Sequence, residues 1–127
     1  MTTALGRDPL AAPRPKLWRV SDRSTFVALR RSDHRVRRGA LSVTWLPDDR
    51  PTPPRVALAV GRGAGGAVVR NRVRRRLRAA LRELLVAGRL PAGAYLVGAG
   101  RTVADHPWPA LVAQLDDAVA AATRSSR

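Results

Sequence analysis

The sequence contains no cysteine among its 127 residues. This absence excludes disulfide bonds, thiolate metal sites and thiol catalysis, and it is compatible with a reducing intracellular compartment. Apolar residues nowhere form a run of membrane-spanning length, and the first ten residues lack the apolar core of a secretory signal. We therefore expect a cytoplasmic protein with no membrane partner.

Side chains suited to catalysis are also scarce. The two histidines, His34 and His106, are far apart in the sequence, and the acidic pairs 48–49 and 116–117 each occupy adjacent positions. Adjacent positions on a helix point in different directions, so such a pair does not converge on one ligand. None of these spacings is typical of a metal site or an acid–base pair. The sequence predicts no catalytic residue and no metal ligand.

Negative charge is the third deficit. Nine acidic residues stand against 24 basic ones, which gives a formal charge of +15. Such an excess in a small protein attracts polyanions, and nucleic acid is the expected partner. Only Lys16 is a lysine, but Ala, Gly, Pro and Val are abundant as well, which is the pattern of a coding bias. The preference for arginine over lysine therefore carries no information about function.

The length suits one domain with a single core. Residues 1–16 mix Pro, Ala and Arg without periodicity, which predicts a flexible N-terminal tail. We assign residues 17–123 to a single RNA-binding domain and residues 124–127 to a C-terminal tail.

The first half of this domain reads as a helix followed by strands. An N-cap at Ser21-Asp22 predicts a short amphipathic helix that ends near residue 32. The chain reads as extended from Val36, residues 37–39 suit a tight connection, and residues 41–46 alternate with β-forming side chains, which together predict a hairpin. The four prolines within residues 47–54 indicate a loop, and the apolar run 55–60 predicts a central strand.

The second half adds two helices and one strand. A glycine-rich segment, residues 61–66, leads into a long helix over 67–87 that ends at Gly88. Residues 93–99 predict a strand, and a helix over 110–122 follows a proline-containing break. The order α-β-β-β-α-β-α predicts an α/β (α+β) two-layer sandwich with about four strands and three helices.

The long helix has two contrasting sides at about 100° per residue. Its apolar stripe consists of Val69, Val73, Leu77, Ala80 and Leu84. Its other side consists of Asn71, Arg72, Arg74, Arg75, Arg78 and Arg82. Six arginines fall within residues 70–78, and like charges three or four apart destabilise a helix by roughly 0.2–0.5 kcal/mol per pair. Because a solubilising face usually interleaves Glu with Arg, this clustering favours a phosphate-rich partner.

The glycine-rich segment invites comparison with nucleotide-binding loops, but the match is poor. A phosphate-binding loop of the Walker type needs Gly-Lys followed by Ser or Thr, and the dinucleotide pattern needs a third glycine at a fixed place. Flexible backbone beside Arg62 instead favours close approach of an RNA backbone.

The strand 55–60, the glycine-rich turn and residues 66–78, with Arg70-Asn71-Arg72 among them, resemble the bacterial ribonuclease P protein component. The resemblance extends over about residues 17–122. It implies a ribosomal protein S5 domain 2-like fold, with an unusual left-handed crossover through the long helix. It also implies a partner, the catalytic RNA of ribonuclease P, which removes the 5′ leader of precursor tRNA with Mg²⁺ held mainly by the RNA. No protein partner is required, and the protein alone is expected to be inactive.

The resemblance assigns two groups of site residues. Together with Arg62, the residues expected to bind RNA are Arg70, Asn71, Arg72, Arg74, Arg75 and Arg78. The cleft expected to bind the leader contains Phe26, Arg30 and Trp45. The family has a second aromatic where this chain has Arg30, and a strand aromatic where it has Thr44 with Trp45 beside it. An alternative for Phe26 is a core anchor of the first helix.

Two other classes of function remain open at the level of sequence. One is a non-catalytic RNA-binding module, such as a ribosomal or RNA-chaperone protein. The other is an architectural DNA-binding protein, which shares the basic charge but for which the sequence offers no groove-reading dimer signature.

Overall fold

The computed structural model describes residues 17–47 and 53–125. The predicted N-terminal tail and most of the proline-rich loop lie outside these residues. The strands are β2 (Trp18–Arg19), β3 (Arg35–Arg38), β4 (Leu41–Leu46), β5 (Arg55–Ala59) and β6 (Ala94–Ala99). The helices are α1 (Arg23–Arg31), α2 (Ala67–Val86) and α3 (Trp108–Ser125), with short 3-10 turns η2 (Arg62–Ala64) and η3 (Arg101–Asp105).

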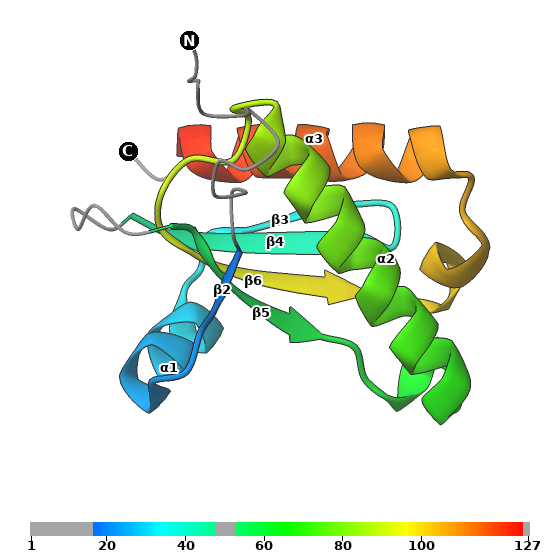
Figure 1. Cartoon of the computed structure of the whole chain (residues 1–127). Coiled ribbons are helices and arrows are strands. Elements are labelled where there is room, and N and C mark those ends of the chain that lie inside the picture. The colour runs from blue at the N-terminus through cyan, green and yellow to red at the C-terminus, as the bar shows by residue number, and fades with distance from the viewer. Residues whose placement is uncertain (1–16, 48–52, 126–127) are drawn as a thin grey trace, which may run out of the picture.

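The strands form one mixed sheet in the order β2-β5-β6-β4-β3. β5 runs parallel to β2 and β6, whereas β4 is antiparallel to β6 and β3. The parallel neighbours β5 and β6 are joined through α2. Seen from the α2 side with these strands turned upright, β6 lies to the left of β5, so the crossover is left-handed, as the resemblance implies (Figure 1).

The predicted fold class is confirmed, with differences of detail. The fifth strand, β2, is missed from sequence because two residues carry no alternation. It is fixed by backbone bonds from the Trp18 N–H to the Pro54 carbonyl (2.9 Å) and from the Val20 N–H to the Val56 carbonyl (3.2 Å). In addition, α3 continues to Ser125 and so includes the first two residues of the predicted C-terminal tail.

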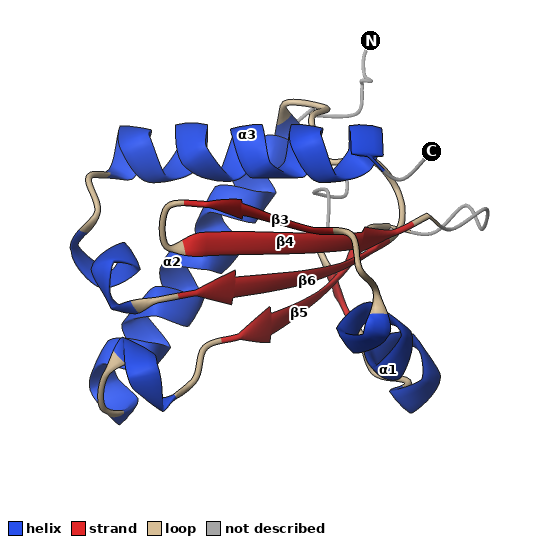
Figure 2. Cartoon of the chain, turned by 180° about the vertical axis from the view of Figure 1, so that it is seen from behind, coloured by secondary structure: helices blue, strands red, loops and turns tan. Residues whose placement is uncertain are grey.

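The main core lies between the sheet and the two long helices, α2 and α3 (Figure 2). Of the predicted apolar stripe of α2, Val73, Leu77, Ala80 and Leu84 are buried, and Leu81 widens it. Full burial of a leucine contributes roughly 1.5–3 kcal/mol, so this stripe fixes α2 firmly and leaves its other side to solvent. The helix ends as predicted, since Gly88 has φ +73° and its N–H donates to the Leu85 carbonyl at 3.1 Å.

Among the described helices, only α1 packs on the opposite face of the sheet. Asp22 caps this helix by accepting a bond from the Thr25 N–H at 3.0 Å, and its carboxylate also lies 3.1 Å from Arg55. Hydrogen bonds from Thr25 and Ser24 hold the pKa of the Asp22 carboxyl well below its usual range. The helix buries Leu29 against Ala94 and Leu96, a small second core. The described residues therefore leave much of this face uncovered.

Candidate nucleic-acid interface

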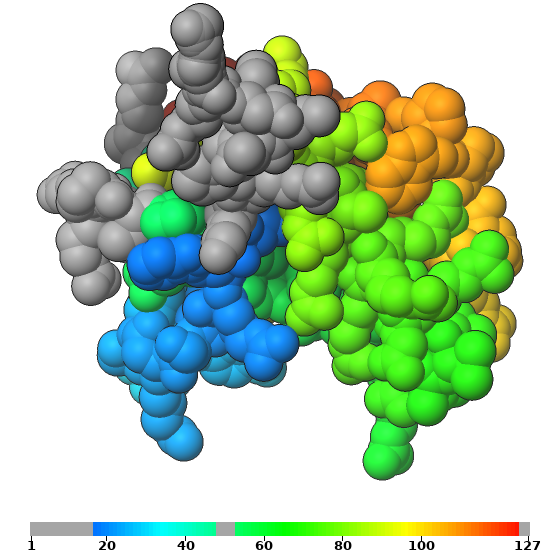
Figure 3. Space-filling view, in the orientation of Figure 1, coloured from blue at the N-terminus to red at the C-terminus, as the bar shows by residue number. Residues whose placement is uncertain are grey.

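The outward side of α2 is a cationic surface, which we call the α2 arginine surface: Asn71, Arg72, Arg75, Arg78 and Arg82. All five residues are exposed, and the helix occupies the front of the molecule in Figure 3. None of these arginines forms an ion pair within the part of the chain that the structure describes. The one acid of the helix, Glu83, instead accepts a bond from the Trp108 indole N–H at 3.2 Å. The positive charge of this surface is left for an external anion.

Two residues predicted to bind RNA lie at the margin of this surface. Arg74 is half-buried and donates to the Asn71 side-chain oxygen at 3.1 Å and to the Val60 carbonyl at 3.4 Å. It therefore orients Asn71 and ties α2 to the end of β5. Arg70 is also half-buried, and its Nε has no acceptor among the described residues.

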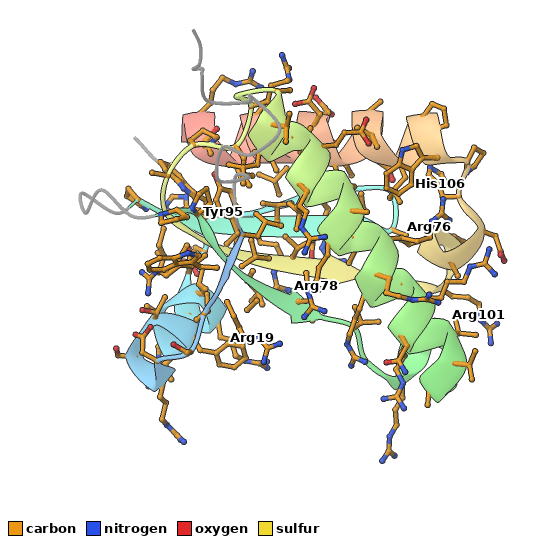
Figure 4. The ribbon with its side chains drawn as sticks, in the orientation of Figure 1. Arg19, Arg76, Arg78, Tyr95, Arg101 and His106 are labelled. Carbon is orange, nitrogen blue, oxygen red and sulfur yellow. The ribbon has the colours of Figure 1, made fainter. Side chains whose placement is uncertain are left out.

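Arg76 differs from its neighbours because it faces inward. Its guanidinium donates to the carbonyls of Val103 (3.0 Å), Ala104 (2.7 Å) and His106, and it lies 5.8 Å from the Trp108 ring centroid (Figure 4). These acceptors belong to the turn η3 and the residue after it. Arg76 holds that turn against α2 and is a structural residue.

The glycine-rich segment forms a turn, with η2 at its centre. The Ala64 N–H donates to the Gly61 carbonyl and the Gly65 N–H to the Arg62 carbonyl, both at 3.0 Å, so these amides are not free for a phosphate. Gly65 has φ +129°, and a Cβ there would lie 3.0 Å from Val69. The segment thus turns the chain tightly into α2 and leaves Arg62 exposed near the start of the helix.

A cleft of about 470 Å³ lies on the uncovered face of the sheet, beside α1; we call it the α1 cleft. Its side chains include three arginines, Arg30, Arg35 and Arg37. The remaining lining residues are mostly small or polar and include Ser42, Thr44, Ala59, Gly98 and Gly100. An open, basic hollow with a floor of small residues leaves room for a polyanionic chain.

The structure brings together two of the three residues predicted for the leader cleft. Phe26 is 37% exposed, and its ring centroid lies 5.7 Å from the guanidinium of Arg30. Arg30 lines the α1 cleft, and Phe26 adjoins the cleft through Arg30 without lining it. Phe26 belongs to neither buried core. Trp45 lies elsewhere: it packs on the α2 and α3 side of the sheet, with its indole N–H donating to the Ala92 carbonyl at 3.1 Å.

Arg35 and Arg37 are missing from the sequence prediction, although their signal is present. They occupy alternate positions of one strand, and residues two apart in a strand point to the same face. The sequence predicts a hairpin connection at residues 37–39, where that rule does not apply to Arg37. The connection is in fact shorter, at Gly39 and Ala40, with Gly39 at φ +58°.

The acidic side chains do not form a metal cage. Among residues 17–47 and 53–125 no three His, Cys, Asp or Glu side chains gather at one point. Asp116 and Asp117 are engaged by Arg89 (2.8 Å) and Arg38 (2.7 Å) respectively. Likewise, none of the helices over the described residues is long and apolar enough to cross a membrane.

An exposed arginine helix and a separate basic cleft on one small α/β domain define a nucleic-acid-binding protein. The family model described as Ribonuclease P matches residues 15–123. The ribonuclease P protein component of Thermobifida fusca is 42% identical over 123 residues, which cover 91% of this chain and 80% of the relative. That of Symbiobacterium thermophilum is 38% identical over 103 residues, covering 80% and 88%.

Solved structures agree in fold. The ribonuclease P protein of Staphylococcus aureus superposes with a TM-score of 0.67 at 19% identity, covering 83% of this chain and 94% of that one. The protein of Thermotoga maritima gives 0.67 at 18% identity, covering 80% and 94%. The chain belongs to the ribonuclease P protein family, which confirms the resemblance seen in the sequence.

Proposed function

We propose that this protein is the subunit of ribonuclease P that assists the catalytic RNA in removing the 5′ leader from precursor tRNA. The observation that carries the proposal is the α2 arginine surface, whose guanidinium groups have no carboxylate partner in the described structure. Like charges one turn apart weaken an isolated helix, and phosphates of a bound RNA relieve that repulsion. Arg62, Arg70 and Arg74 flank this surface and extend the same contact.

The leader, in this proposal, occupies the α1 cleft. Phe26 offers a ring on which an unpaired base stacks, and stacking of this kind contributes about 1–3 kcal/mol per base. Arg30 steadies that ring and, with Arg35 and Arg37, faces the leader's phosphates. Because stacking and phosphate contacts read little sequence, the cleft accepts leaders of different sequence. Trp45, on the other face of the sheet, has no part in it.

The chemistry belongs to the RNA. The aspartates Asp22, Asp116 and Asp117 are each paired with an arginine, so they do not suit a bound Mg²⁺. We therefore assign Mg²⁺ to the RNA and expect the protein alone to be inactive. No further protein partner is required, and the complex works in the cytoplasm, as its bacterial relatives suggest.

A binding experiment tests the α2 contact. Replacing Arg72 and Arg75 by Gln removes two exposed charges and preserves helix propensity. Affinity for the catalytic RNA of Thermobifida fusca should fall, and its log–log salt slope should flatten by up to about 0.7–0.9 units per lost contact. An unchanged slope would contradict the proposal.

The second candidate is a non-catalytic RNA-binding module, which the same basic surface also favours. A ribosomal RNA fragment of equal length separates the two. The proposal predicts tighter binding to the catalytic RNA than to that fragment in the same buffer. Equal binding to both RNAs would favour the module.

A further inference from the structure

A second groove, of about 210 Å³, runs between β2 and α2 at the edge of the sheet. Figure 3 shows it as the hollow between the blue surface near residue 20 and the green surface of α2. Its floor is apolar and consists of Leu17, Val56 and Leu58. Its walls are cationic: Arg19 stands on β2, and Arg78 and Arg82 stand on α2. In Figure 4, Arg19 and Arg78 flank the same space.

Within residues 17–47 and 53–125 these three arginines have no hydrogen-bond or ion-pair partner. No carboxylate of these residues lines the groove. Arg78 and Arg82 lie one helical turn apart, so each repels the other, and Arg19 adds a third positive charge across the groove. An apolar floor lowers the local dielectric and strengthens the attraction of such a site for an anion.

Trp18 borders the same groove and is 46% exposed. Its strand is held by backbone bonds to Pro54 and Val56, so β2 does not depend on packing of the indole. An exposed ring beside three guanidinium groups is a combination that binds unpaired nucleotides, with the base on the ring and the phosphate on the charges.

The groove adjoins the α2 arginine surface. Arg78 lines the groove and also a shallow hollow on the outer side of α2, together with Val68, Asn71, Arg74 and Arg75. An RNA strand that follows α2 from its first turn therefore reaches the groove without leaving the cationic surface.

We propose that the groove between β2 and α2 holds a phosphate of the catalytic RNA between Arg19, Arg78 and Arg82, with the adjoining unpaired base on Trp18. The inference rests on the proposed function, because it extends the RNA contact of α2 to the edge of the sheet. The RNA contact thus ends on a strand that is distant in sequence from the arginine helix.

The test compares double variants in binding to the catalytic RNA of Thermobifida fusca without substrate. Arg19→Gln with Arg82→Gln removes two groove charges and leaves Arg78 in place. The matched control, Arg23→Gln with Arg31→Gln, removes two charges from the outer side of α1. The groove variant should flatten the log–log salt slope by up to about 1.4 units, the value for two contacts to single-stranded RNA. The control should leave the slope unchanged, and equal slopes for groove and control variants would overturn the inference.

The variant with Gln at positions 72 and 75 serves as reference. If it loses affinity while the groove variant does not, the proposed function stands and the groove inference fails. If neither variant loses affinity, the proposed contact of α2 fails as well.

Substitution of Trp18 gives an independent measurement. Trp18→Ala should weaken binding to the same RNA by about 5- to 150-fold, the range expected for one stacked base. Trp18→Phe, which keeps an aromatic face, should retain most of the affinity. Urea unfolding of both variants checks that the fold is intact. Wild-type affinity of Trp18→Ala, or equal losses for Ala and Phe, would contradict stacking.

Discussion

Phe26 is the single residue whose environment best separates a packing role from a binding role. It is 37% exposed and lies outside both cores, while Leu29 on the same helix is fully buried. Phe26→Ala should therefore change the free energy of unfolding by less than about 1 kcal/mol, as is usual for substitutions outside a core. It should weaken holoenzyme binding of leader-bearing precursor tRNA by about 1–3 kcal/mol and leave mature tRNA binding unchanged.

Two variants serve as controls for this prediction. Phe26→Tyr keeps the ring and should bind like wild type, whereas Leu29→Ala should lose about 2–5 kcal/mol of stability. Equal losses for precursor and mature tRNA, together with a large drop in melting temperature, would make Phe26 a packing residue.

Arg76 shows how neighbouring arginines take opposite roles. It donates to three backbone carbonyls of residues 103–106, and its replacement removes those three hydrogen bonds. We expect Arg76→Gln to lower the free energy of unfolding by about 2–3 kcal/mol in urea denaturation. The exposed neighbour is the control: Arg75→Gln should stay within about 0.5 kcal/mol of wild type. Similar values for both variants would show that Arg76 does not hold η3.

At the scale of residues, the sequence predicts which side of α2 is apolar and which is cationic. It does not predict the role of each arginine on the helix. With 3.6 residues per turn, Val73 and Leu77 fall on the apolar side of the helix. Arg75 and Arg78 fall on the cationic side. Arg76 lies near the boundary between the sides. Its acceptors lie about thirty residues later in the chain, so no local pattern reveals them.

The strand β3 presents arginines to both faces of the sheet, with one pair at the α1 cleft and one residue in an ion pair with α3. Arg35 and Arg37 line the α1 cleft, while Arg38 points to the other face and pairs with Asp117 at 2.7 Å. Replacing Arg35 and Arg37 by Gln should weaken holoenzyme binding of precursor tRNA and flatten its salt slope by up to about 1.4 units. Mature tRNA, which lacks the leader, should bind as before.

Arg38→Gln is the control within the same strand. Because its guanidinium faces α3, the variant should keep the salt slope for precursor tRNA. A loss shared by Arg38→Gln and the cleft variant would mean that the strand contributes general charge and no leader site.

Elements with strong periodicity are predictable, and short ones are not. α2 begins at the predicted residue, and β5 ends one residue before the predicted end. Both are predicted well because burial gives each a clear pattern of apolar residues. β2 consists of two residues whose pairing depends on β5, 37 positions later in both pairs, from Trp18 to Arg55 and from Arg19 to Val56. Trp45 shows a similar limit of prediction from sequence. A shift of one residue in a strand moves a side chain to the other face of the sheet. The face of Trp45 follows from the register between β4 and β6.

At the scale of the whole molecule, charge and shape work together. Among the described elements, the helices α2 and α3 cover one face of the sheet and α1 lies over part of the other (Figure 2). The α1 cleft lies on that second face. The +15 charge predicts a nucleic-acid partner, but composition does not reveal two basic surfaces on opposite sides of one sheet. The fold creates that division, and in the proposed function the two surfaces bind the catalytic RNA and the leader separately.

Cleavage of precursor tRNA tests this account most directly. The measurement is the rate at low magnesium with the Thermobifida fusca catalytic RNA alone, with wild-type protein, and with the variant carrying Gln at positions 72 and 75. Because the proposed contacts would neutralise phosphates that Mg²⁺ must otherwise screen, wild-type protein should raise the rate at low magnesium. The variant should need a higher protein concentration for the same effect. A rate with wild-type protein no greater than that of the RNA alone would contradict the account.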